Sequence, residues 1–413
     1  MSDVTQAERE AYLSPLLLEL RKPENRADPY SLYKKWREES PMHCSRAGFW
    51  TLTRYNDIVA VLRDDRFSVD PNNATVPEEI LGPPPDDQAM FKEMSGRILL
   101  FTDPPDHTRI RTLVSKAFTR VTIEQLRPHI ADIVNGLLDS ASDRGKMDVI
   151  EDFAYPLPAL VICELMGVPV EDRDRFRGMS GDIAPILDPF TSPETLQKAV
   201  QTAGMFVMYF ADLIEKRRAD PQDDLLSALV AAEEGGEHLN IEELIGLCVL
   251  VFIAGHETTQ NLIGNGLLAL LRNRAQLERL RDDPSLGRNA VEELLRYDSP
   301  VQLTARSPTE DVVVSGETIK KGEEVVVLLG AGNRDPAQFA EPDTLDITRE
   351  KIPVISFGGG VHFCLGAPLA RIEGQIAFAQ LLQRFPNIDL AEEEPEYRDT
   401  LTLRGLKGLK VRL

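Results

Sequence analysis

The sequence predicts a mainly helical protein with a small sheet region. Helical periodicity dominates from about residue 106 to 297, where only prolines and paired glycines interrupt it. Those breaks are expected near Pro156, Pro169, Pro189 and Gly235–Gly236. Residues 311–329 instead alternate like paired strands around Gly316 and Gly322. No repeat, low-complexity segment or convincing linker divides the chain, so we expect one domain over 1–413.

The elements before the helical stretch follow from local signals. Residues 1 to about 30 predict a partly ordered lead-in, and the run FWTLT at 49–53 predicts a short strand. Asn56 is the expected cap of an amphipathic helix that ends near Arg63. The stretch 77–101, with three consecutive prolines and several acids, predicts a loop.

The longest predicted helix starts with a variant capping box, Asn240 with Glu243 three residues on. It runs to about Arg272, roughly 48 Å at 1.5 Å per residue. Thr258 lies four residues after Ala254, so its hydroxyl can bond that carbonyl and bend the helix. Gly255 leaves space beside the bend, where a small diatomic ligand can sit next to a proton donor.

The C-terminal part predicts a last helix from about Cys364 to Arg384, followed by short strands over 399–413. The loop before this helix, FGGGVHFCLGAPLAR at 357–371, has three glycines that allow a sharp turn and expose backbone N–H groups. Pro368 is tolerated in the first turn. Cys364 therefore stands at a helix N-terminus, where the dipole and the N–H groups favour a thiolate.

A thiolate in such a loop is the axial ligand that some haem proteins use, because its electron push favours O–O cleavage. Two other interpretations of the loop exist. A phosphate-binding loop fails, because no Lys-Ser/Thr follows the glycines. A catalytic cysteine paired with His362 remains possible, although two residues so close need not face each other.

Composition excludes several classes of partner. The 46 Lys and Arg against 67 Asp and Glu leave a formal charge of −21, which repels nucleic acid and anionic lipid. The most hydrophobic run, from Leu247 to Ala254, is far shorter than the ~20 residues that cross a bilayer. The first ten residues are polar and acidic, unlike a signal peptide. We therefore expect a cytoplasmic protein with no nucleic-acid or membrane partner.

The 4 cysteines are too widely spaced for a zinc ribbon, an iron–sulfur cluster or a disulfide framework. Cys44, Cys163 and Cys248 are interpreted as small hydrophobic residues. Only Cys364 has surroundings that point to chemistry.

The cysteine loop resembles the signature of the cytochrome P450 family, Phe-Gly-x-Gly-x-x-x-Cys-x-Gly, at every fixed position. The segment AGHETT at 254–259 resembles the family's oxygen-activation motif. The resemblance covers about residue 30 to the C-terminus. It implies a triangular helical prism with a small β-rich lobe, and haem buried between the central helix and the helix after the cysteine loop.

The resemblance also implies roles for individual residues. Cys364 would bind the iron of haem b, Thr258 would hydrogen-bond dioxygen at the haem, and Glu257 would relay protons from solvent. His256 falls at the variable position and is interpreted as structural. The other expected haem-pocket residues, propionate partners first, are His107, Arg111, Arg306, His362, Ala254, Gly255, Phe357, Gly358 and Gly366.

Glu293 and Arg296 form an i,i+3 pair. By itself it would be interpreted as a surface salt bridge that contributes little to stability. In the family that the chain resembles, Glu-x-x-Arg is a buried pair that braces the cysteine loop. A third member is expected downstream, and Arg349 is preferred to Arg334.

The resemblance implies a monooxygenase that inserts one atom of O2 into an apolar or partly apolar molecule by hydroxylation or epoxidation. No flavin or nicotinamide fingerprint occurs, so a ferredoxin or flavodoxin with its reductase must supply electrons. The expected landing patch comprises Arg109, Lys116 and Arg120 on the His107 helix, with Arg371. Expected substrate contacts are Leu99, Leu100, Ile186, Phe190, Val251, Ala254, Val301, Leu303, Leu401 and Thr402.

Three rival functions use the same residues. A peroxide-driven hydroxylase or oxidative coupling enzyme keeps the haem, but Glu257 and Thr258 favour dioxygen, since both serve proton delivery. A haem gas sensor or carrier would leave that pair idle. A haem-free cysteine hydrolase is the third rival.

Overall fold

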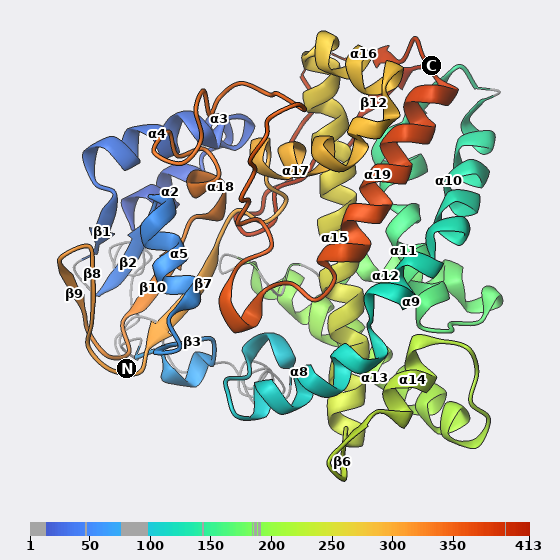
Figure 1. The fold of residues 1–413 in the computed structure, drawn as a ribbon, viewed down its shortest axis with the longest axis horizontal. Coiled ribbons are helices and arrows are strands. Elements are labelled where there is room, and N and C mark those ends of the chain that lie inside the picture. Colours follow the sequence, from blue (N-terminus) through green and yellow to red (C-terminus); the bar gives the residue numbers. More distant parts are fainter. Residues whose placement is uncertain are drawn as a thin grey trace.

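The computed structural model describes residues 14–45, 48–75, 98–142, 144–183, 185, 188, 191–392 and 394–413. Helices make up one side of the molecule and a sheet with a few short helices makes up the other (Figure 1). The predicted fold class, mainly helical with a small sheet region, is confirmed. None of the described helices is long and apolar enough to cross a membrane.

The long helix α15 (Ile241–Arg272) is the spine of the helical side (Figure 1). It is buried on almost every face, because apolar side chains surround it for most of its length. The helices packed against it are α11 (Pro156–Leu165), α12 (Arg173–Ile183), α13 (Pro193–Ala219), α14 (Leu225–Ala231), α16 (Arg274–Asp282), α17 (Gly287–Tyr297) and α19 (Ala367–Arg384). Its start is the predicted capping box: Asn240 accepts from the Glu243 N–H, and the Glu243 carboxylate accepts from the Asn240 N–H.

The rest of the helical side lies around this core. It consists of α8 (Asp106–Ala117), α9 (Arg120–Gln125), α10 (Arg127–Ser142) and a π-helical segment, Ile150–Ala154. The break predicted at Pro156 is confirmed, because α11 begins there, and Pro169 precedes the short turn Val170–Asp172. Gly235 and Gly236 form the turn between β5 (Glu233–Glu234) and β6 (Glu237–His238). Pro189 lies outside the described residues.

The sheet side contains five strands in the order β1-β2-β10-β7-β3. Their bounds are β1 (Met42–Cys44), β2 (Phe49–Leu52), β10 (Glu324–Val327), β7 (Thr304–Pro308) and β3 (Phe67–Ser68). Strand β10 runs parallel to β2 and antiparallel to β7. Alternate residues of β10 point to opposite faces of the sheet. Val325 and Val327 pack in a hydrophobic cluster with α5 (Tyr55–Arg63), and Val326 packs in another with the N-terminal helices.

Two further predictions about strands are confirmed only in part, because the strand after Gly322 pairs with β2 and β7 rather than with the strand before it, and only Lys410–Arg412 of the segment 399–413 forms a strand. Strands β8 (Val312–Val314) and β9 (Glu317–Ile319) form a hairpin at Gly316, and Gly322 precedes β10; both glycines have positive φ. The C-terminal segment forms β12 (Lys410–Arg412), between β4 (Lys146–Asp148) and β11 (Asp389–Leu390). Of the predicted loop at 77–101 only 98–101 is described, and Leu99–Phe101 is a 3-10 turn.

Part of the predicted lead-in is packed against the sheet. Residues 14–30 contain α2 (Pro15–Leu20), α3 (Pro23–Ala27) and the start of α4 (Pro29–Glu39). The buried side chains of α2 contact the sheet face that carries Val326 and Leu328. The N-terminal helices thereby cover one face of the sheet.

Two predicted helix starts are wrong. Helix α5 begins at Tyr55, so Asn56 lies inside it, and its first N–H donates to Asp335 Oδ2 at 2.8 Å. The last helix begins at Ala367, so Cys364 precedes its first residue by three positions. The loop before Cys364 packs closely against α5. A Cβ at Gly360 would lie 2.3 Å from the Leu62 carbonyl oxygen, so this position requires glycine.

Candidate functional site

The cysteine loop holds Cys364 between a turn and the start of α19. The Cys364 N–H donates to the Phe357 carbonyl at 3.0 Å, and the next N–H groups, of Gly366 and Ala367, donate to its sulfur. Burial raises the pKa of the Cys364 thiol, while these two donors, Arg111 and Arg371 lower it. The N–H groups at the start of α19 thus favour the thiolate, as the sequence predicts, while burial opposes them. Coordination to a metal cation would keep the sulfur of this half-buried cysteine deprotonated.

Four potentially cationic side chains meet beside the loop. His107 and Arg111 come from one face of α8, Arg306 from β7, and His362 from the loop itself. The rings of His107 and His362 lie 4.2 Å apart, and Arg111 Nη2 donates to the Phe363 carbonyl at 2.8 Å. Burial, followed by the charges of His107, Arg306 and Arg111, lowers the pKa of His362 to about 3. The predicted group thus comes together from three separate segments.

This cluster fits a ligand that carries carboxylates. Burial lowers the pKa of Arg306 to about 10, so its guanidinium stays charged at neutral pH. Asp103 acts on Arg306 and His107, but its carboxylate also accepts from the Val69 N–H and the Ser68 hydroxyl. The buried His107 Nδ1 has no hydrogen-bond partner among the described residues. Haem propionates would supply an acceptor for His107 Nδ1 and negative charges for Arg111 and Arg306.

The middle of α15 is open on one side. Ala254 is exposed and Thr258 half-buried, although Phe252, Ile253 and Glu257 around them are buried. The Thr258 hydroxyl donates to the Ala254 carbonyl at 2.6 Å, as the spacing predicts. The residues of this turn therefore fit a helix that faces a cofactor.

Gly255 has a different role from the one we expected. A Cβ at this position would lie 2.9 Å from Ile162 Cδ1, so the glycine lets α11 approach α15 closely. The space that it leaves is taken by a side chain rather than kept open for a small ligand.

Glu257 is buried and pairs with an arginine from the C-terminal segment. Arg398 Nη1 donates to Glu257 Oε1 at 2.7 Å. Burial raises the pKa of Glu257; Arg398 opposes this effect, and the charge of Asp188 adds to it. Sequence reasoning missed Arg398, because it stands in no motif and its partner lies 141 residues away.

His256 points to the other side of the helix. One ring nitrogen, Nε2, lies 2.9 Å from the Tyr155 carbonyl oxygen, and burial lowers the pKa of the imidazole to about 4. A neutral ring at pH 7 that packs against Tyr155 is consistent with a structural residue.

The expected bracing pair is completely buried. Arg296 donates to Glu293 at 2.7 and 2.8 Å, and Arg349 Nε donates to the same carboxylate at 3.2 Å. Arg334 instead donates to the Tyr297 carbonyl and to Asp343. Of the two candidates for the third member, Arg349 is thus the one in contact.

Asn333 connects this brace to the cysteine loop. Its carbonyl accepts from Arg296 at 3.2 Å, and its side chain donates to Ser356 Oγ at 2.8 Å, one residue before Phe357. Sequence reasoning missed this connection, because an asparagine in a short turn carries no distinguishing signal.

The predicted substrate contacts fall into separate groups. Leu99 and Val251 belong to the main helical core, whereas Leu303 and Leu401 share a cluster on the sheet side. Val301 bridges to Leu403, next to Thr402, while Leu100 and Ala254 are exposed. Ile186 and Phe190 lie outside the described residues.

The predicted landing patch needs two corrections. Arg120 begins α9 and so is not on the His107 helix. Arg109 pairs with Glu243, and Arg371 pairs with Glu292 and lies over the ring of Phe357. Two of the four cations are thus already neutralised by carboxylates.

Comparison with known proteins gives consistent results. The family model described as Cytochrome P450 matches residues 81–410. The chain is 42% identical over 392 residues to the biotin biosynthesis cytochrome P450 of Bacillus subtilis (strain 168), covering 93% of this chain and 96% of that protein. It is 43% identical over 398 residues to the polyketide biosynthesis cytochrome P450 PksS of the same strain, covering 94% and 96%.

Solved structures share the fold as well. The chain superposes with a TM-score of 0.87 on P450BioI, whose crystal structure is a complex with an acyl carrier protein ligated to hexadec-9Z-enoic acid. The two chains are 41% identical, and the match covers 95% of this chain and 99% of that one.

Proposed function

The chain belongs to the cytochrome P450 family and is a haem-thiolate monooxygenase, and we propose that Cys364, Thr258 and Glu257 are the residues that perform its chemistry. The reaction consumes O2 and needs a redox partner. The observation that carries the assignment of Cys364 is its half-buried side chain, whose sulfur accepts two backbone N–H groups beside a cluster of two arginines and two histidines.

The residues around the cysteine fit haem b. Arg111 and Arg306 would pair with its propionates, while His107 and His362 would hydrogen-bond them. When bound, haem supplies the binding and reductive activation of dioxygen. The turn with the exposed Ala254 and the half-buried Thr258 would then contribute to the same pocket.

Proton delivery falls to the neighbouring pair on α15. The Thr258 hydroxyl already donates to the Ala254 carbonyl, which leaves its oxygen free to accept a second hydrogen bond. Glu257, raised in pKa by burial, can take a proton from water and pass it toward Thr258. These two groups favour dioxygen over peroxide as the oxidant.

The substrate is proposed to be an apolar or partly apolar small molecule, and the electron donor a ferredoxin or flavodoxin with its reductase. The aliphatic character of the expected contacts supports the first proposal. The names of the two relatives, which refer to biotin and polyketide biosynthesis, support a biosynthetic role. Lys116 and Arg120 remain candidates for the docking patch, and the cytoplasmic location remains a prediction.

The assignment of Cys364 is tested by the absorption of the reduced protein with carbon monoxide. A thiolate ligand gives a strongly red-shifted Soret band, which we expect for the wild type and for a Cys44→Ser control. Cys364→His should bind haem without that band. A normal band in Cys364→His would refute the assignment.

A further inference from the structure

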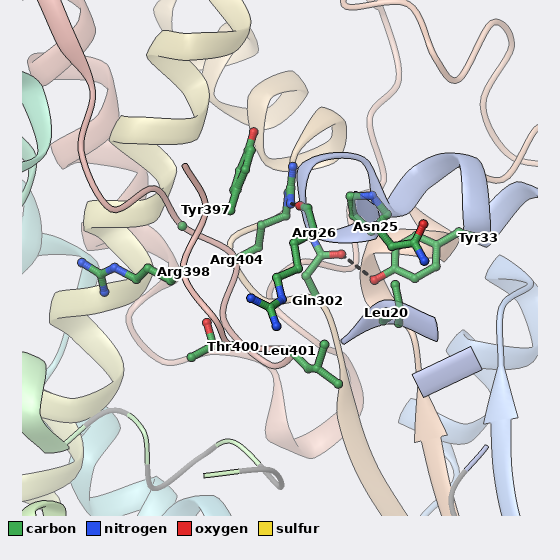
Figure 2. Close-up of a pocket in the computed structure, with 12 residues that line it drawn as sticks. Leu20, Asn25, Arg26, Tyr33, Gln302, Tyr397, Arg398, Thr400, Leu401 and Arg404 are labelled. Carbon is green, nitrogen blue, oxygen red and sulfur yellow. Dashed lines mark hydrogen bonds between the residues drawn. The ribbon is translucent and has the colours of Figure 1, made fainter. Parts of the chain in front are cut away.

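Two acids hold the same short stretch of the C-terminal segment, residues 398–402. Arg398 Nη1 donates to Glu257 on α15 at 2.7 Å. The N–H groups of Leu401 and Thr402 donate to Asp188 Oδ2 at 2.6 and 3.2 Å. Figure 2, a view of a small pocket that this stretch lines, shows Arg398 and Leu401 pointing in different directions. Glu257 thus ties the stretch to α15, and Asp188 ties it to the segment between α12 and α13.

The carboxylate of Asp188 is suited to fixing the turn at 401–402. Two successive N–H groups that converge on one oxygen form an anion-binding arrangement, and an ionised acceptor makes stronger hydrogen bonds than a neutral one. The backbone of Asp188 is itself held. Its N–H donates to the Pro185 carbonyl at 3.1 Å, and its carbonyl accepts from the Thr191 N–H at 3.2 Å. The carboxylate therefore extends from a fixed point of the backbone.

The opposite side of the turn is bound to the chain between α17 and β7. The Gln302 N–H donates to the Thr402 carbonyl at 2.9 Å. Leu401 and Thr402 are both proposed substrate contacts, and both are half-buried. Their position thus depends on hydrogen bonds on two sides of the turn, and Asp188 supplies those on one side.

The charge of Asp188 also reaches Glu257. Burial raises the pKa of Glu257, Arg398 lowers it, and the negative charge of Asp188 raises it. The neighbouring His256 is neutral at pH 7, because burial lowers its pKa to about 4. Among the described residues, Arg398 and Asp188 are therefore the charged groups that set the balance between the acid and carboxylate forms of Glu257.

We propose that Asp188 is a positioning residue of the monooxygenase reaction, because its carboxylate fixes the turn Leu401–Thr402 beside the substrate and its charge acts on Glu257. This inference rests on the proposed function, since it concerns the substrate contacts and the proton donor assigned there. Asp188 acts through these residues and is not itself a catalytic residue. One carboxylate thus links the shape of the substrate pocket to the proton supply.

Two substitutions separate the two effects. Asp188→Asn keeps a carbonyl oxygen that can accept both N–H groups but removes the charge, whereas Asp188→Ala removes both. Asp182→Asn, which removes an acid of α12 that pairs with Lys198, is the matched control and should behave as the wild type in every measurement. All variants are compared with the wild type in the haem-loaded form.

The position of the turn is measured by hydrogen exchange of the peptide 398–404 and by the affinity for econazole, an apolar azole that binds haem iron. Asp188→Ala should exchange faster in this peptide and bind econazole about 5- to 10-fold more weakly, because loss of the two hydrogen bonds frees one side of the turn. Asp188→Asn should stay close to the wild type. Unchanged exchange or unchanged econazole affinity in Asp188→Ala would refute the positioning role.

The effect of the charge is measured by carbon-13 NMR of glutamate-labelled protein in its reduced carbon monoxide form. The signal of Glu257 is assigned by its absence in Glu257→Gln. Removal of a negative charge favours the carboxylate, so the titration midpoint of Glu257 in Asp188→Asn should fall by about half a pH unit. An unchanged or higher midpoint would refute the proposed effect on Glu257.

These outcomes are distinct from those that test the proposed function. The strongly red-shifted carbon monoxide band, which tests Cys364, should be the same in every Asp188 variant and in the wild type. If the band is present and both Asp188 variants behave as the wild type, the inference fails and the proposed function stands. Absence of the band from the wild type would refute the role of Cys364 instead.

Discussion

Arg398 Nη1 lies 2.7 Å from Glu257 Oε1, which joins the C-terminal segment to the middle of the central helix. The Glu257 side chain is 5% exposed and that of Arg398 is 26% exposed, so the arginine lies between the buried acid and the surface. Arg398 also lines a small pocket between the N-terminal helices and the C-terminal segment (Figure 2). It is therefore placed to set both the charge of Glu257 and its position.

Replacing Arg398 by Gln is expected to raise the pKa of Glu257 further. Burial and Asp188 already favour the neutral acid, and Arg398 is the group that opposes them. The carboxylate form would then be present only at higher pH, so the acid limb of the rate profile should move to higher pH. Measuring the rate of coupled product formation against pH would show this, and Arg398→Lys should largely restore the wild-type profile. An unchanged limb in Arg398→Gln would contradict the prediction.

Replacing Thr258 by Ala is expected to uncouple electron use from product formation several-fold. The variant loses the hydroxyl that is bonded to the Ala254 carbonyl and with it the group through which Glu257 is proposed to deliver protons. The ratio of product formed to reductant consumed measures the effect. Thr258→Ser keeps the hydroxyl and should keep most of the coupling, so a similar loss in both variants would point to packing instead.

Replacing Glu293 by Ala is expected to destabilise the protein by about 3–5 kcal/mol, because Arg296 and Arg349 lose their shared carboxylate. Denaturant unfolding of the haem-loaded protein measures this loss. Glu19→Ala removes an exposed pair with Lys22 and should cost less than about 1 kcal/mol. Equal effects of the two substitutions would mean that the buried triad does not brace the fold.

The burial of Glu373 is expected to make the stability of the protein depend on pH. It is completely buried, its Oε2 has no partner among the described residues, and burial raises its pKa to about 8. Because the folded pKa exceeds the unfolded one, stability is full below the unfolded value and is lost as pH rises toward 8. Glu373→Gln should therefore raise stability near pH 8 by on the order of 1–3 kcal/mol and change little near pH 4. Thermal unfolding at both pH values tests this, and equal melting temperatures of variant and wild type near pH 8 would contradict it.

The sequence by itself determined the features that depend on neighbouring residues. The glycines before Cys364 reveal a tight loop, because glycine adopts the positive φ of Gly358 and Gly360 without strain. The capping box at Asn240 marks the start of α15, and the i,i+4 spacing of Ala254 and Thr258 predicts their hydrogen bond. Each of these features is a short-range rule of backbone geometry.

Only the tertiary structure decided the features that join distant segments. Asp335 receives the first N–H of α5 across 280 residues, which displaces the cap predicted at Asn56. Arg398 reaches Glu257, and Asn333 connects the Glu293 brace to the cysteine loop, although no spacing rule links these positions. Burial, which raises the pKa values of Cys364 and Glu257, likewise exists only once the elements have packed. Such contacts are set by the packing of whole elements, and a local pattern carries no record of them.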